Sequence, residues 1–227
     1  AINALEKTDK ALNNARKLNA PVKKIRVFDF DDTLAKSKSM VIVNMPDGST
    51  TQINATQFAQ QASDLESQGA EFDFSEFSKV VDGKKGPLFE VAKKIADVRG
   101  TEDVFILTAR PQNADGPIQA FMKANGIDIP LKNITGLGDG TAQAKAGWIM
   151  GKAAEGYNDF YFADDAVKNV KAVKDVLSQV DVKSKVQLAK ASKKVTFDTI
   201  VNDMIEDSSG IETYKQYSAA RAKTIGA

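Results

Sequence analysis

The stretch of sequence that decides the fold is Val27-Phe28-Asp29-Phe30-Asp31-Asp32-Thr33-Leu34. Three carboxylates follow an apolar run here, and residues 23–30 read as a buried strand. In a parallel sheet covered by helices, ligands bind at the carboxyl ends of the strands. Side chains two residues apart leave a strand on the same side, so Asp29 and Asp31 are expected to face one site. An acidic turn is the plainer alternative, but mutually repelling acids at a strand end predict a bound divalent cation.

Further strands and helices alternate along the chain. Short apolar runs predict buried strands over 104–107 and 160–163, with a shorter strand near Ile134. Helical patterns and their end signals predict helices over 87–98, 116–125, 141–155 and 166–180. Strands alternating with helices predict a parallel sheet covered on both faces, which is a three-layer, Rossmann-like α/β fold.

The chain between the first two long strands holds more than one connecting helix. Residues 40–53 predict a hairpin around Pro46-Asp47-Gly48, and Asn54 is expected to cap a helix that runs to about Gly69. The aromatic and acidic segment 72–77 is expected to be irregular. These features lie between the strand at 23–30 and the helix predicted over 87–98.

The two ends of the chain differ from the part between them. Residues 1–21 read as an amphipathic helix that ends at Pro21. Residues 191–227 read as a helical extension or linker. The domain that carries the sheet is therefore expected over 22–190.

Composition limits the chemistry that the chain performs. Its 227 residues are 42% hydrophobic and 27% charged, as in a globular domain with extensions. The absence of cysteine and histidine excludes disulfides, thiolate nucleophiles and the usual general base. Catalysis would then use carboxylates, lysines, hydroxyls and a hard metal ion bound by oxygen. No apolar run is long enough to span a membrane, and a net charge of +1 predicts no strong attraction to nucleic acid.

Three further segments carry polar groups in suggestive places. Thr108 follows the second apolar strand, where a hydroxyl binds a phosphate oxygen or simply stabilises the turn. Lys145 lies near the start of the 141–155 helix, although Lys132 and Lys152 compete for the same role, and a solvated lysine is the plainer interpretation. Asp164-Asp165 ends another apolar strand, and two strands that end in acidic pairs indicate one shared metal.

These segments resemble the four motifs of the haloacid-dehalogenase superfamily. Asp29-Phe30-Asp31-Asp32-Thr33 resembles the signature DxDx[TV], and Thr108, Lys145 and Asp164-Asp165 resemble the later motifs in the same order. The resemblance covers about residues 23–190. It implies the three-layer fold of that superfamily, with residues 38–80 as a small cap.

The resemblance also implies a role for each residue. Asp29 would attack phosphorus and form an aspartyl-phosphate, and Asp31 would act as general acid and base. Mg²⁺ would be held by Asp29, by Asp164 and by the backbone carbonyl of Asp31, with Asp165 supporting the ion. The residues expected to bind the phosphoryl group are Thr108, Lys145 and Asp32.

The implied activity is Mg²⁺-dependent hydrolysis of a phosphomonoester, with a phosphorylated small molecule as partner and a cytoplasmic location. One alternative is the processing of nucleic-acid ends, as in polynucleotide 3′-phosphatases. Lysines that would favour it, or form a solvated face, are Lys183, Lys185, Lys190, Lys193 and Lys194.

A second alternative is a structural role. The chain also resembles phosphatase-like modules of tailed phages, which would be virion-associated and would join a larger assembly through the terminal helices. Ala1 in place of an initiator Met fits a segment or a processed product.

Overall fold

The computed structural model describes Glu6, Lys10 and residues 20–190. The predicted extension over 191–227 and nearly all of the predicted helix over 1–21 lie outside the described residues. At the centre is a five-stranded sheet in the order β10-β9-β1-β7-β8, and every pair in it is parallel. Its strands are β1 (Lys24–Phe28), β7 (Val104–Thr108), β8 (Ile134–Gly136), β9 (Asp159–Asp164) and β10 (Lys183–Leu188).

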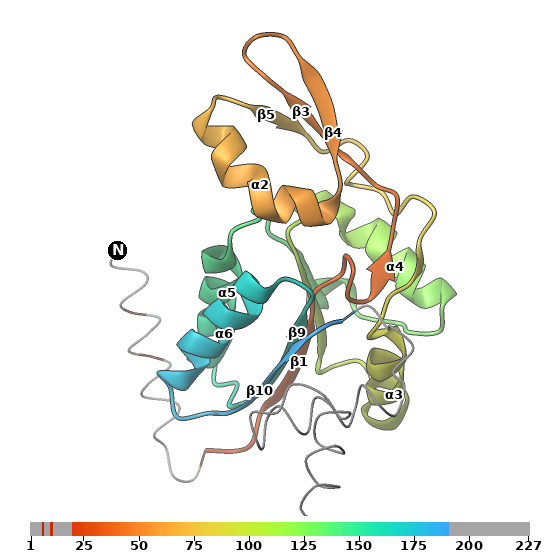
Figure 1. The fold of residues 1–227 in the computed structure, drawn as a ribbon. Helices are drawn as coiled ribbons and strands as arrows, with labels where there is room; N and C mark the ends of the chain where they lie inside the picture. The colour runs from red at the N-terminus through yellow and green to blue at the C-terminus, as the bar shows by residue number, and fades with distance from the viewer. Residues whose placement is uncertain (1–5, 7–9, 11–19, 191–227) are drawn as a thin grey trace, which may run out of the picture. The chain divides into compact units, whose positions relative to one another are not determined.

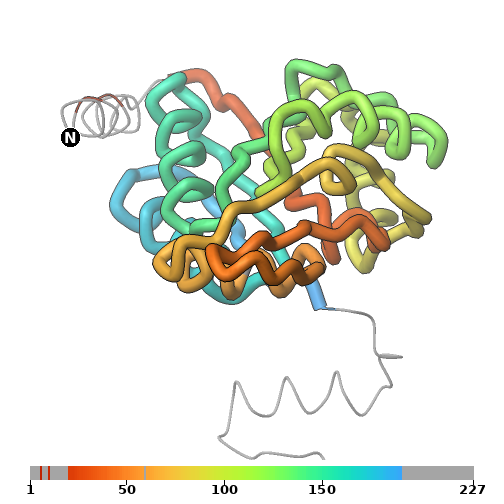
Figure 2. The backbone as a smooth tube through the Cα atoms, turned by 90° about the horizontal axis from the view of Figure 1, so that it is seen from above, coloured from red at the N-terminus to blue at the C-terminus, as the bar shows by residue number. Residues whose placement is uncertain are grey.

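Helices cover both faces of this sheet. The first pair is α3 (Phe89–Arg99) and α4 (Asp115–Ala124), and the second is α5 (Ala142–Ala154) and α6 (Val167–Ser178). Phe28 packs in one core with Ala92 and Ile118, whereas its neighbour Val27 packs in a second core with Ile149. Successive side chains of a strand point to opposite faces, so one apolar strand supplies both cores. The two helix pairs lie on opposite sides of the molecule (Figure 1, Figure 2), and the predicted helix-covered parallel sheet is confirmed.

Residues 38–80, which we call the insertion, form a separate small layer. Its three-stranded antiparallel sheet has the order β4-β3-β5. Its elements are β3 (Val41–Asn44), β4 (Thr50–Ile53), α2 (Ala55–Ser67) and β5 (Glu71–Asp73). Beside it, the antiparallel pair β2 (Ala35–Lys36) and β6 (Lys84–Lys85) joins the two ends of the insertion. The insertion stands over the carboxyl ends of the central strands (Figure 1).

The insertion confirms two sequence predictions and corrects a third. The hairpin is present as β3 and β4, and Asn54 caps α2 through reciprocal hydrogen bonds with Gln57. The segment 72–77 is not wholly irregular, because β5 pairs with β3. Its aromatic rings form the core of the insertion around Phe58, with ring centroids at 5.2 Å for Phe72, 5.4 Å for Phe74 and 6.1 Å for Phe77.

The edge strand β10 has no counterpart in the sequence prediction. Lys183 and Lys185, for which the sequence leaves open a nucleic-acid contact or a solvated face, are both exposed on this strand. Only its last three residues are half-buried, so the apolar run that marks an interior strand is missing. Among the residues that the structure describes, no helix combines the length and apolarity that crossing a membrane requires.

Candidate active site

Three carboxylates from two strands meet at the carboxyl edge of the central sheet. β1 and β9 are paired neighbours in which Phe28 lies opposite Ala163, so the residues that follow reach the same place. One carboxylate oxygen from each of Asp29, Asp164 and Asp165 lies within 4.8 Å of the others. The convergence expected from the sequence is therefore present for Asp29, Asp164 and Asp165, whereas the carboxylate of Asp31 pairs with Arg110, and the chemical roles of these residues stay predictions.

Lys145 of α5 forms ion pairs with two of these acids. Thr141 caps α5 by accepting a hydrogen bond from the backbone N–H of Ala144, which places Lys145 one turn into the helix. Its ammonium nitrogen is 2.7 Å from Asp29 Oδ1 and 2.6 Å from Asp164 Oδ2. All three side chains are buried, so the ion pairs are shielded from water.

The two competing lysines lie elsewhere. Lys132 pairs with Glu102 at 3.7 Å and is exposed. Lys152 pairs with Glu155 at 3.0 Å and lies over the Trp148 ring. Of the three lysines weighed from the sequence, Lys145 is the one at the acidic cluster.

The acidic cluster carries more negative charge than its lysine offsets. Burial raises the pKa of Asp29 well above its ordinary value; Lys145 opposes this, and Asp164, Asp165 and Asp31 add to it. Burial, then the charges of Asp164 and Asp32, raises the pKa of Asp165 to about 7. Burial alone would lower the pKa of Lys145, but its two acidic partners raise it above its ordinary value. The cluster would therefore gain from a further cation.

Asn169 supplies a further oxygen at this place. It lies in the first turns of α6, and its Nδ2 donates to both carboxylate oxygens of Asp164, at 3.0 and 3.1 Å. Its Oδ1 is buried and has no hydrogen-bond partner among the described residues. Carboxylate and amide oxygens are the donors that hard divalent cations prefer. The residues present thus fit a hard divalent cation, for which Asp29, Asp164 and Asp165 would be the carboxylate ligands.

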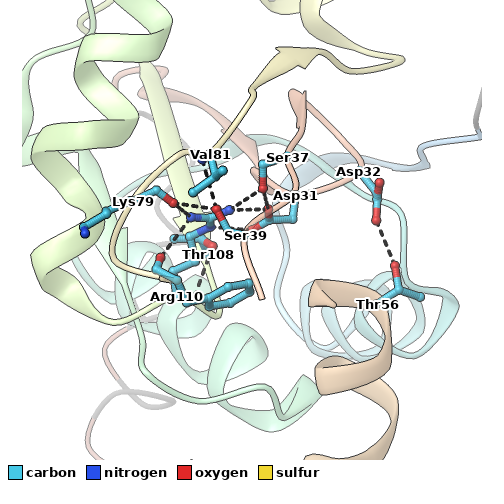
Figure 3. A network of polar contacts seen from close by, with 10 residues as sticks. Asp31, Asp32, Ser37, Ser39, Thr56, Lys79, Val81, Thr108 and Arg110 are labelled. Atoms are coloured by element: carbon cyan, nitrogen blue, oxygen red, sulfur yellow. Dashed lines mark hydrogen bonds and ion pairs between the residues drawn. The ribbon is translucent and has the colours of Figure 1, made fainter. Parts of the chain in front are cut away.

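Asp31 faces a different partner, Arg110. The guanidinium is fully buried, and its Nε and Nη2 donate to the two oxygens of Asp31 at 2.8 and 2.7 Å. The remaining N–H groups donate to Ser37 Oγ and to the backbone carbonyls of Phe77 and Lys79 (Figure 3). A guanidinium has five N–H groups, so every one of them is used here.

Asp32 turns away from Asp31 and toward the insertion. Its backbone φ is +54°, in the left-handed region that Asp tolerates better than most residues. Its Oδ2 accepts from Thr56 Oγ1 of α2 at 2.8 Å (Figure 3), and its backbone N–H donates to Ala35. Asp32 thus links the strand-end loop to the insertion, and the phosphate-binding role expected for it stays a prediction.

Thr108 is the last residue of β7 and lines the same cavity. It is buried, and its Oγ1 accepts from the backbone N–H of Arg110 at 3.2 Å. The hydroxyl hydrogen therefore remains available to a bound anion.

Sequence reasoning missed two residues of this site. Arg110 stands two residues after Thr108, and Asn169 stands five after Asp164, at the start of the next helix. The signal that would find them is position, since both closely follow a strand end that carries a predicted site residue. Comparison of the chain with protein-family models, curated proteins and solved structures finds no match.

Proposed function

We propose that the chain is a Mg²⁺-dependent phosphomonoester hydrolase of the haloacid-dehalogenase kind, with the insertion as its small cap. The observation that supports this most is the Lys145 bridge between Asp29 and Asp164. It joins at one buried point three residues that resemble separate motifs of that superfamily. A purely structural domain has no need to concentrate uncompensated acids in its interior, because buried charges without partners are destabilising.

In this proposal Asp29 and Asp31 carry out the chemistry. Asp29 attacks phosphorus, the bond to the leaving oxygen breaks, and an aspartyl-phosphate forms. Asp31 gives its proton to the leaving oxygen and then takes one from the water that releases phosphate. Both oxygens of Asp31 accept from Arg110, but each carboxylate oxygen has two lone pairs, so Oδ2 retains one for the transferred proton. Arg110 then acts as a positioning residue that fixes where Asp31 works.

Thr108 and Lys145 would bind the phosphoryl oxygens through a hydroxyl and an ammonium group. Asp29, Asp164 and the backbone carbonyl of Asp31 would hold Mg²⁺, with Asp165 and the free Oδ1 of Asn169 in support. The ion would supply the positive charge that lets an anionic nucleophile approach an anionic phosphate.

The test measures phosphate release from an aryl phosphate with Mg²⁺ and with a chelator. The wild-type chain should release phosphate only with the metal, and Asp29→Asn should lower the rate at least about 10³-fold, because the nucleophile is lost. Asp47→Asn is the control, since Asp47 lies in the hairpin turn and is hydrogen-bonded to Ser49. Unchanged turnover in Asp29→Asn rejects the mechanism. No release with any divalent metal favours the structural, phage-module alternative.

A further inference from the structure

The cavity at the site has two unlike walls. It has a volume of about 350 Å³, near the lower end of the range of about 300–1,000 Å³ that holds small ligands. The strand-end wall includes Asp29, Thr108, Lys145 and Asp165. The insertion contributes Ala55, Thr56, Gln60 and Phe77. If Asp29 attacks in line, the leaving group departs on the side away from it, toward the insertion.

The insertion wall carries no positive charge. The residues that the insertion contributes to the lining are uncharged. Thr56 and Gln60 are four residues apart on α2, so they present a hydroxyl and an amide on one helix face. The lining lysines come from the opposite side: Lys145 from α5, and Lys168 from α6, where its ammonium donates to the Gly140 carbonyl at 3.2 Å.

Negative charge lies beside the insertion wall. The carboxylate of Asp32 lines the cavity, and it accepts from Thr56, a neutral hydroxyl rather than a cation. By contrast, Arg110 offsets the charge of Asp31 at both oxygens. The charge of Asp32 reaches into the cavity, since it contributes to raising the pKa of Asp165.

We propose that this cavity selects phosphomonoesters whose leaving group is neutral or cationic and carries hydroxyl or amino groups, and that Asp32 sets this selectivity. The inference rests on the proposed function and names its substrate class. A hydroxyl or ammonium of the leaving group donates to Asp32 or to the side chains of α2. A carboxylate or a second phosphate meets like charge at the same place, and such repulsion is an effective means of rejecting a ligand.

The same argument disfavours the end of a nucleic acid as substrate. A polynucleotide brings its next phosphate within a few bonds of the terminal phosphomonoester. The charge of nucleic-acid phosphates is neutralised by lysine and arginine, and the residues that the insertion contributes to the lining include neither.

The experiment compares two three-carbon esters with Mg²⁺ present. Glycerol 3-phosphate has a neutral leaving group, and 3-phosphoglycerate has a carboxylate. We expect kcat/KM to be at least about tenfold higher for glycerol 3-phosphate, because the carboxylate of 3-phosphoglycerate meets the like charge of Asp32. Equal values, or a preference for 3-phosphoglycerate or for a 3′-phosphorylated oligonucleotide, overturn the inference.

Two Asp→Asn variants assign the effect to one residue. Asp32→Asn removes the charge, retains an oxygen for Thr56 and suits the left-handed backbone, so it should reduce the preference to within about threefold of unity. Asp82→Asn is the matched control, because Asp82 also has a positive φ, of 47°, and does not line the cavity. It should retain the full preference. A preference unchanged in Asp32→Asn overturns the role of that residue.

A binding measurement separates this inference from the proposed function. Calorimetry on Asp29→Asn with the same two esters compares affinities without turnover. Tighter binding of glycerol 3-phosphate together with no hydrolysis by the wild-type chain retains the selectivity and rejects the enzyme. Hydrolysis of both esters with equal affinities rejects the selectivity alone.

Discussion

Asp29 and Asp31 are two residues apart on one loop, yet their carboxylates have opposite surroundings. Asp31 is paired at both oxygens with a guanidinium whose every N–H group is used. Asp29 shares one ammonium group with Asp164 and lies beside Asp165 as well. The chain thus completes one ion pair from its own residues and leaves the other cluster short of positive charge. This difference separates an acid that the chain positions with its own cation from a cluster that attracts an added cation.

The largest effect is expected from breaking the completed pair. Arg110→Gln leaves Asp31 and two buried carbonyls without their partner, and loss of one member of a buried pair costs about 3–5 kcal/mol of unfolding free energy. Urea denaturation measures this loss, and added Mg²⁺ should not restore it. Arg99→Gln, at the exposed end of α3, serves as control. A loss below about 1 kcal/mol would show that the Asp31–Arg110 pair is not the more stabilising of the two surroundings.

A smaller and reversible effect is expected at the other cluster. Lys145→Met leaves Asp29 and Asp164 without an ammonium, although the raised pKa values of Asp29 and of the neighbouring Asp165 let the cluster take up protons in its place. We expect a loss of about 2 kcal/mol at pH 8 without metal, and partial recovery with Mg²⁺. Lys132→Met, at an exposed ion pair, should change neither the unfolding free energy without metal nor its response to Mg²⁺. Recovery by Mg²⁺ in Arg110→Gln but not in Lys145→Met would reverse the comparison.

The acidic cluster should also make stability depend on pH. The pKa of Asp165 is raised from 3.8 to about 7 in the folded chain, so between these values the folded state binds more protons than the unfolded state. Its contribution to stability is therefore present below about pH 4 and is lost as pH rises to about 7, by up to about 1.4 kcal/mol per pH unit. Thermal unfolding without metal should show this fall. Asp165→Asn should reduce the slope, with Asp29 supplying the rest, and a slope of the same size in that variant would contradict the assignment.

The smallest effect on stability is expected at the hydrogen bond that joins Asp32 to α2 of the insertion. Thr56→Val removes one hydrogen bond to Asp32, which is worth about 1 kcal/mol. Thr51→Val, on the exposed strand β4, is the matched control. Hydrogen exchange of the α2 amides would show whether the bond holds the insertion in place. Exchange as slow as in the wild-type chain would contradict that role.

Sequence patterns predicted the central sheet because its strands are short apolar runs with polar ends. The strands β1, β7 and β9 are of this kind. Thr141 and Asn54 are the N-cap residues of α5 and α2. β10 lacked the pattern, since an edge strand has one neighbour and retains exposed lysines. β5 was not predicted, because it is three residues long and its one apolar residue, Phe72, packs on Phe58 of α2 rather than within an apolar run.

In the candidate site, too, residues marked by a local sequence pattern were predicted and residues defined by tertiary contacts were not. Asp29, Asp164 and Lys145 were predicted because they follow strand ends or open a helix. The partners of Asp31 and Asp164 were not, because Arg110 and Asn169 acquire their importance only through tertiary contacts. The left-handed turn that directs Asp32 to Thr56 likewise has no signal in an Asp-Asp pair.

Two of the five bonds of Arg110 end on main-chain oxygens, those of residues 77 and 79, where the polypeptide returns from the insertion. Any amino acid presents such an oxygen, so the contact at residue 79 makes no demand on sequence identity, whereas Phe77 also places its ring centroid 4.5 Å from Arg110 Cζ. An insertion of different sequence that keeps this ring can therefore still be held beside Asp31 by Arg110. The main chain at residues 77 and 79 thus ties the insertion to the site independently of most of its side chains, in addition to the bond from Thr56 to Asp32.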